Sequence, residues 1–128
     1  MKPRETIALF DAQGNSIGTK DRVSAYRDGE CVGLSFVWAA WPAPNGAIRT
    51  LLQTRSRPGD PYLGSLDSPA AGHVRADEPP AETARRELLE ETGYRAESMN
   101  LLFSGPTSAG MTSEITHLFL ATGLQQVS

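Results

Sequence analysis

The chain has 128 residues, enough for one domain with a single core. Hydrophobic and charged contents of 39% and 21% are near globular norms, and a net charge of −3 gives no support for binding nucleic acid or an anionic membrane. No apolar run approaches the roughly 20 residues of a membrane span, and the N-terminus does not resemble a signal peptide. The single cysteine, Cys31, excludes an internal disulfide and favours a reducing cytoplasm.

A small hairpin is predicted at the N-terminus. Residues 7–10 form a short apolar run, residues 11–15 are a cluster of turn-forming types, and residues 16–19 resume as a second short strand. The next stretch, residues 20–30, is mostly polar and predicts a loop or a short irregular helix.

The most strand-like segment runs from Cys31 to Trp41, where large and small side chains alternate. Asn45-Gly46 is the preferred pair for a tight hairpin turn, so residues 47–53 are predicted to return as the partner strand. Residues 54–69 have a loop composition rich in glycine and proline. Arg55 and Arg57 in this loop either bind phosphate groups, which match a guanidinium fork, or are solvated loop charges.

Five glutamates lie between Gly72 and Tyr94, three of them at positions 87, 90 and 91. On a helix with about 3.6 residues per turn, Glu87 and Glu91 are one turn apart and Glu90 lies beside them. Like charges at this spacing repel by a few tenths of a kcal/mol per pair, a cost that a bound cation would remove. Carboxylates without histidine or cysteine are the ligands that suit Mg²⁺ or Mn²⁺.

The glutamates are predicted to lie on a helix from Ala81 to Thr92. Two prolines precede it, as is tolerated at a helix start, and Gly93 follows it as a C-terminal stop. At about 100° per residue, Ala81, Ala84 and Leu88 face the core, and the acidic side chains line the adjoining side.

Two more strands are predicted beyond the helix, at residues 99–103 and 115–121, joined by a loop of small residues at 104–114. The two histidines, His73 and His117, are expected to be loop or strand residues rather than metal ligands, because the acidic set needs no imidazole.

The acidic stretch also carries the fixed positions of the Nudix box, with Tyr94 at a position where an aliphatic residue is commoner. The chain therefore resembles a Nudix hydrolase. The matching residues are Gly72, Glu78, Arg86, Glu87, Leu88, Glu90, Glu91, Gly93 and Tyr94.

This resemblance implies an α/β fold of the α+β type, with a mixed β-sheet flanked by helices and a loop-helix-loop box. It implies one Nudix domain over residues 1–128 without the closing helix usual in such domains, so the domain is expected to be trimmed, completed by a partner subunit or part of a longer chain. An exposed apolar face or an open cleft is then expected, with a homodimer as the natural remedy.

The resemblance also implies roles for the box. Glu87 and Glu91 resemble the principal ligands of a divalent metal, Mg²⁺ or Mn²⁺, and Glu90 a further ligand that is also a candidate for the catalytic role. The backbone carbonyl of Ala71 joins the metal shell in some relatives. Arg86 is expected to pair with Glu78, which would hold the loop against the helix, with Gly72 and Gly93 permitting the turns at either end.

The two halves of the chain resemble different branches of the family. Residues 108–114 and the strand after them are similar to ADP-ribose pyrophosphatases, which implies that Glu114 is a general base on a mobile loop. One departure is Ala109, where those enzymes usually have proline. The front half resembles proteins similar to isopentenyl diphosphate isomerase, through residues 11–22 and the run from Gln53 to Ser56. Cys31 lies far ahead of that run, which disfavours isomerase activity.

The predicted function is metal-dependent hydrolysis of a diphosphate linkage in a nucleoside diphosphate joined to another group, with an ADP-ribose-like substrate favoured. Arg55 and Arg57 are the predicted substrate contacts. The alternatives are hydrolysis of free nucleoside di- or triphosphates or of isoprenoid-like diphosphates, and a non-catalytic domain that binds a nucleotide as a sensor.

Overall fold

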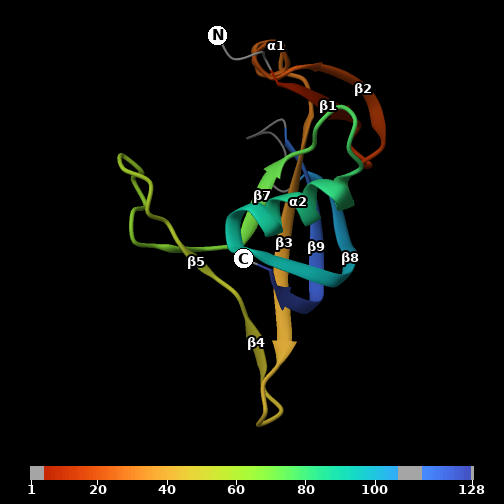
Figure 1. The fold of residues 1–128 in the computed structure, drawn as a ribbon. Helices are drawn as coiled ribbons and strands as arrows, with labels where there is room; N and C mark the ends of the chain where they lie inside the picture. The colour runs from red at the N-terminus through yellow and green to blue at the C-terminus, as the bar shows by residue number, and fades with distance from the viewer. Residues whose placement is uncertain (1–4, 107–113, 128) are drawn as a thin grey trace.

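The computed structural model describes residues 5–106 and 114–127, which form a mixed β-sheet packed against one long helix (Figure 1). This confirms the predicted α+β class. The sheet has the strand order β2-β1-β3-β9-β8, with β4 and β7 also paired to β3, and a separate two-stranded ribbon joins β5 to β6. The elements are β1 (Thr6–Phe10), β2 (Ser16–Asp21), α1 (Arg22–Arg27), β3 (Val32–Pro42), β4 (Ile48–Thr50), β5 (Gln53–Thr54), β6 (Leu66–Asp67), β7 (Ala70–His73), α2 (Pro80–Thr92), β8 (Tyr94–Pro106) and β9 (Glu114–Gln126).

Strand β3 organises the sheet. One edge pairs with β9 in parallel, and the other pairs in turn with β1 at Val32, with β7 over residues 34–37 and with β4 over residues 40–42. Because β7 pairs with the middle of β3, the backbone of Ala71 and Gly72 is fixed beside the centre of the sheet. The loop that leads into α2 therefore starts from a rigid strand.

Helix α2 covers one face of the sheet (Figure 1). Ala84 and Leu88 are fully buried there against residues of β3, β7, β8 and β9, and Ala81 is partly buried beside them, as the helical spacing predicts. The helix begins at Pro80, one residue before the predicted start. It ends at Thr92 as predicted, and Gly93 caps it, because the left-handed φ of 75° at Gly93 lets its N–H reach the carbonyl of Leu89.

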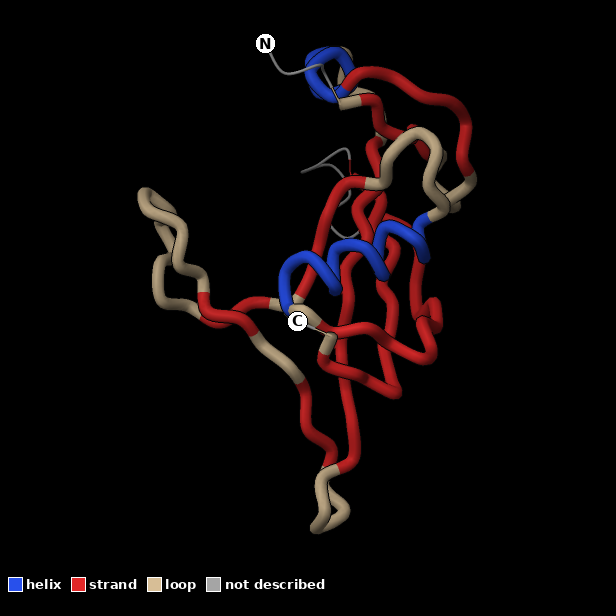
Figure 2. Tube along the Cα trace, in the orientation of Figure 1, coloured by secondary structure: helices blue, strands red, loops and turns tan. Residues whose placement is uncertain are grey.

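The predicted hairpin after β3 is only partly right. Residues 48–50 pair with the end of β3, but residues 53–54 pair with β6 instead. The edge of β3 that they would need is already occupied by β7. Figure 2 shows the consequence, because the β3–β4 turn and the loop between β5 and β6 both project away from the sheet.

The last two strands are longer than predicted. Strands β8 and β9 form an antiparallel pair, and residues 94–98 extend β8 beyond the predicted 99–103 because they pair with residues 122–126 of β9. The predicted loop at 104–114 is also shorter, since residues 104–106 belong to β8 and Glu114 begins β9. Residues 107–113 of that loop, including Ala109, lie outside the described residues.

The face of the sheet opposite α2 carries exposed apolar side chains. Trp38 of β3 is 55% exposed, and it lines a pocket of about 440 Å³ with Ile48, Leu52 and Leu120. Across residues 5–106 and 114–127 no helix follows α2 in the chain, and none of the helices there is long and apolar enough to cross a membrane.

Candidate functional site

Three box glutamates lie on the side of α2 that borders β7. Glu91 reaches the strand directly, because one carboxylate oxygen accepts a hydrogen bond of 3.0 Å from the backbone N–H of Ala71. Its other oxygen lies 3.5 Å from the side-chain nitrogen of Gln53 in β5. Glu91 therefore connects α2 to two strands that are distant in sequence.

Gly72 is required by the close approach of Glu87. A Cβ added at Gly72 would lie only 2.7 Å from Cγ of Glu87 and closer still to its carboxylate. Real Cβ atoms do not come so near another heavy atom, so a side chain here would displace Glu87. The box glycine thus makes room for the carboxylate that the sequence predicts as a metal ligand.

Arg86 holds the loop before α2 against the helix. Its Nε and Nη2 donate to the two carboxylate oxygens of Glu78 at 2.8 and 3.0 Å, the two-pronged geometry that suits a guanidinium. Its Nη1 donates to Glu87 at 2.8 Å and lies 3.4 Å from Glu90. The side chains of Arg86 and Glu78 are only 18% and 17% exposed, so solvent screens this ion pair weakly.

The pKa values of Glu78 and Glu87 are shifted in opposite directions. The Arg86 guanidinium, with help from the Thr83 hydroxyl, holds the pKa of Glu78 below its usual range. Burial, with smaller effects from Glu91 and Glu90, raises the pKa of Glu87 even though Arg86 opposes the rise. A nearby cation would favour the ionised form of Glu87.

The donor set fits a divalent metal in chemistry, with oxygen ligands only. The carboxylates do not converge, however, because Glu87 is bonded to Arg86 and Glu91 to Ala71 and Gln53. Within residues 5–106 and 114–127, no three acidic, histidine or cysteine side chains come together closely enough to hold an ion. Glu87, Glu90 and Glu91 would have to turn toward a bound cation.

A polar pocket of about 250 Å³ adjoins Glu91, and both predicted substrate arginines line it. Arg55 is engaged, since its guanidinium donates to Asp60 at 2.7 Å and to Asp67 at 2.6 Å. These bonds fasten the loop between β5 and β6. Arg57 also lines this pocket, and its charge helps to lower the pKa of Asp60, after hydrogen bonds from the Tyr62 N–H and from Arg55.

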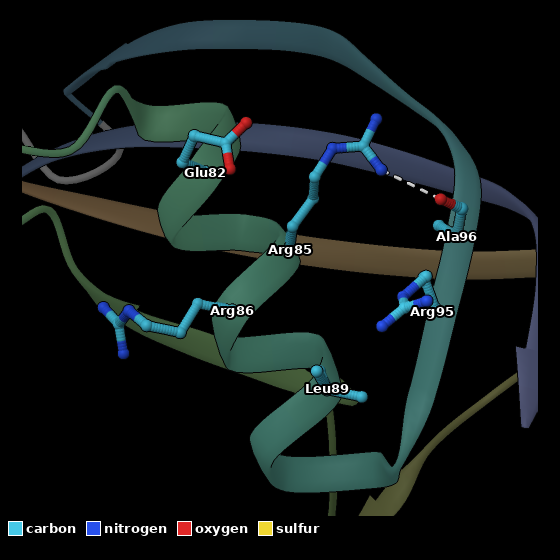
Figure 3. Close-up of a pocket in the computed structure, with 6 residues that line it drawn as sticks. All are labelled: Glu82, Arg85, Arg86, Leu89, Arg95 and Ala96. Carbon is cyan, nitrogen blue, oxygen red and sulfur yellow. Dashed lines mark hydrogen bonds between the residues drawn. The ribbon is translucent and has the colours of Figure 1, made fainter. Parts of the chain in front are cut away.

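A second pocket, of about 320 Å³, lies beside another side of α2. Its lining includes Glu82 and Arg86 but none of the three glutamates at positions 87, 90 and 91. Arg85 is held at its border by a hydrogen bond of 2.8 Å to the carbonyl of Ala96. Figure 3 shows Arg86 pointing away from Arg85 and Arg95. The Arg86–Glu78 pair therefore belongs to the glutamate site.

Glu114 is not on a loop in the structure, because it is the first residue of β9. Its carboxylate accepts from the hydroxyl of Tyr26 at 3.2 Å, and that hydroxyl is 2.6 Å from Nε2 of His73. Burial, together with the charge of Glu114, raises the pKa of Tyr26. The sequence gives no signal for Tyr26, which lies 88 positions from Glu114.

Several proteins of known name are similar to this chain. It is 34% identical over 119 residues to GDP-mannose pyrophosphatase of Yersinia enterocolitica, covering 91% of this chain and 58% of that protein. It is 31% identical over 90 residues to isopentenyl-diphosphate Delta-isomerase of Halorhodospira halophila, covering 70% and 50%. It is 46% identical over 54 residues to ADP-ribose pyrophosphatase of Bacillus subtilis, covering 42% and 29%. The chain thus spans less than two thirds of the length of each relative.

The fold is shared with a protein from Deinococcus radiodurans of known crystal structure. The match has a TM-score of 0.66 at 20% identity and covers 93% of this chain and 72% of the other. The family profile described as the NUDIX domain matches residues 39–127, which include the whole glutamate site on α2 and β7. The chain therefore belongs to the NUDIX-domain family.

Proposed function

We propose that this chain hydrolyses the diphosphate linkage of a nucleoside diphosphate joined to another group, with a divalent metal as cofactor and an ADP-ribose-like substrate favoured. The observation that carries the proposal is the cluster of three glutamates on α2, in which Glu87 packs against Gly72 of β7, Glu91 accepts from Ala71 of β7, and Glu90 lies beside Arg86. Relatives named as pyrophosphatases of ADP-ribose and GDP-mannose support this substrate class.

Glu87 and Glu91 are the principal residues that would hold the metal, Mg²⁺ or Mn²⁺, with Glu90 and the carbonyl of Ala71 beside them. When bound there, such an ion would neutralise charge on the phosphate oxygens and lower the pKa of a water molecule. The Arg86–Glu78 ion pair holds the loop before α2 against the helix that carries these glutamates, and Gly72 leaves space for Glu87.

Glu114 is the proposed general base, with Glu90 as the alternative within the box. Glu90 is the more exposed of the two Arg86 partners on α2, with 55% of its side chain accessible against 17% for Glu87. We assign contact with the substrate phosphates to Arg57, in the polar pocket beside Glu91. Arg55 shapes the same pocket while bonded to Asp60 and Asp67.

Isoprenoid-like diphosphates are the second candidate substrates, because the similarity to an isopentenyl-diphosphate isomerase covers 70% of this chain. Isomerase chemistry itself is disfavoured by the position of Cys31. That residue is half-buried against the cluster of Ala8, Phe10, Val74 and Ile115. Free nucleotides as substrates, or a sensor that binds without cleavage, are the remaining alternatives.

We also propose that the chain forms a homodimer through the face opposite α2. The apolar pocket lined by Trp38, Ile48, Leu52 and Leu120 supports this, because a second copy would remove that surface from water. The cytoplasmic location expected from the single cysteine remains a prediction.

A substrate panel tests the proposed function. ADP-ribose, GDP-mannose, free nucleotides and isoprenoid diphosphates are incubated with Mg²⁺ or with chelator, and mononucleotide and phosphate release is followed. We expect Mg²⁺-dependent release of mononucleotide from ADP-ribose or another nucleotide sugar. Binding without product would favour the sensor, and release only from free nucleotides or isoprenoid diphosphates would replace the favoured substrate class.

A further inference from the structure

Three side chains from distant segments meet on the face of the sheet opposite α2. Residues of a strand point alternately to its two faces. Ala70 of β7 and Phe119 of β9 pack under α2, so His73 and Glu114 point to the other side. Tyr26, from the last turn of α1, lies over both of them.

The position of Tyr26 is fixed by the packing of α1. Asp21 caps the helix by accepting from the N–H of Ser24 at 3.0 Å, and Ala25 is fully buried in a cluster with residues of β1 and β3. The ring of Tyr26 also meets that of His73 edge-on, with centroids 5.8 Å apart. The hydroxyl is therefore held in place between its two partners.

The number of protons available on Tyr26, Glu114 and His73 determines which group donates in each hydrogen bond. An ionised carboxylate can only accept, and a phenol has one proton to give. If Tyr26 donates to Glu114, the contact to His73 is a hydrogen bond only when Nε2 of His73 carries the proton and donates to the Tyr26 oxygen. Both contacts are then satisfied as a chain from His73 through Tyr26 to Glu114.

We propose that Tyr26 is a positioning residue for Glu114, oriented in turn by His73. This inference rests on the proposed function, in which Glu114 is the general base. His73 lies two residues after Ala71 on β7, or about 7 Å along the strand. Since the N–H of Ala71 holds Glu91, the chain of hydrogen bonds fixes Glu114 relative to the strand that also holds the metal-site carboxylate.

A double-mutant cycle separates positioning from a general effect on the fold. Tyr26→Phe removes only the hydroxyl, and Glu114→Gln removes the base. General-base catalysis contributes on the order of 10² to 10⁴ in rate, so we expect Tyr26→Phe to lower kcat by about tenfold with KM nearly unchanged. In the Glu114→Gln background the same substitution should cause no further loss, because Tyr26 acts through Glu114.

Tyr62→Phe is the matched control, because Tyr62 is 66% exposed and should tolerate loss of its hydroxyl with kcat unchanged. An unchanged kcat in Tyr26→Phe, or the same loss in both backgrounds, would overturn the positioning role. Full activity of Glu114→Gln would overturn both this role and the assignment of Glu114 as the base.

Nitrogen-15 NMR of the imidazoles tests the hydrogen-bond chain without turnover. The chain has two histidines, so a His117→Gln variant assigns the signals of His73. We expect the proton of neutral His73 on Nε2, and a shift of that nitrogen in Tyr26→Phe but not in Tyr62→Phe. A proton on Nδ1, with Nε2 as acceptor, would overturn the proposed direction. If wild-type protein cleaves no substrate, the proposed function fails while these spectra still decide how Tyr26 is bonded.

Discussion

The glutamate site depends on one arginine more than on any other single residue. Arg86 joins Glu78, Glu87 and Glu90, and it also keeps the helix and the preceding loop together. The Arg86–Glu78 pair is expected from the resemblance to the Nudix box, which contains both residues, and the structure shows the pair.

Replacing Arg86 by alanine should destabilise the fold. It would leave the largely buried carboxylate of Glu78 without its partner, so we expect the free energy of unfolding to fall by about 2–3 kcal/mol. Urea denaturation at neutral pH with chelator present measures this without a contribution from metal binding. Arg95→Ala, at an exposed position, is the control and should change it by no more than about 0.5 kcal/mol. Equal effects of the two substitutions would contradict the role given to Arg86.

Other contacts of the site lie beyond what residue types and spacing predict. Tyr26 and Glu114 are brought together by the packing of α1 and by the pairing of β3 with β9, neither of which a local pattern encodes. The sequence likewise places Glu114 on a loop, because pairing with β3 is a long-range interaction. Its assignment as a base stays a prediction.

At the scale of elements, the loop between β5 and β6 forms one wall of the polar pocket beside Glu91. The sequence composition predicts a loop here. It cannot distinguish the roles of Arg55 and Arg57, because both are charged residues among glycines and prolines. The structure separates them by their partners. Arg55 is bonded to Asp60 and Asp67, and it therefore holds the loop, whereas contact with the substrate is the role proposed for Arg57.

Alanine substitutions should separate the two roles. Arg57→Ala should raise KM about tenfold, because roughly one charge-assisted hydrogen bond to phosphate is lost. It should leave the loop intact. Arg55→Ala should raise KM and also make the loop more sensitive to limited proteolysis, since its fastening is lost. The measurements are steady-state kinetics and a proteolysis time course on both variants. Equal proteolysis of the two, or an unchanged KM in Arg57→Ala, would contradict this division.

At the scale of the whole molecule, the chain divides its sheet between a packed face and an open one. The packed face under α2 follows from helical spacing and is predicted correctly. On the opposite face, α1 covers one end of the sheet, and the apolar side chains left exposed beyond it include Trp38 and Ile48. Sedimentation of wild type and of Trp38→Lys tests the proposed homodimer. We expect wild type to form a dimer and the Trp38→Lys substitution to weaken it. A monomer at every concentration would contradict the homodimer.

Buried His117 should make stability depend on pH. It is 2% exposed, its Nδ1 is 2.8 Å from the Ser104 hydroxyl, and burial lowers its pKa from the usual 6.5. Below pH 6.5 the unfolded chain therefore binds a proton that the folded chain does not, so the free energy of unfolding falls as the pH falls through this range.

Urea denaturation across about pH 5.5–7.5 measures this dependence, and His117→Gln should flatten it relative to wild type. The lowered pKa of His73 contributes in the same direction in both proteins and cancels in the comparison. Parallel pH profiles of wild type and His117→Gln would contradict the assignment to His117.

The proposed hydrolysis depends on the box glutamates as metal ligands. The test is a calorimetric titration with Mg²⁺ and a measurement of turnover of the best substrate, both on the same samples of wild type, Glu91→Gln and Glu82→Gln. Glu82 lies in the first turn of α2, outside the glutamate cluster, and serves as the matched control. We predict that Glu91→Gln loses Mg²⁺ affinity and at least about 10²-fold in kcat, while Glu82→Gln resembles wild type. Full turnover by Glu91→Gln with unchanged Mg²⁺ binding would contradict the role of the box glutamates as metal ligands.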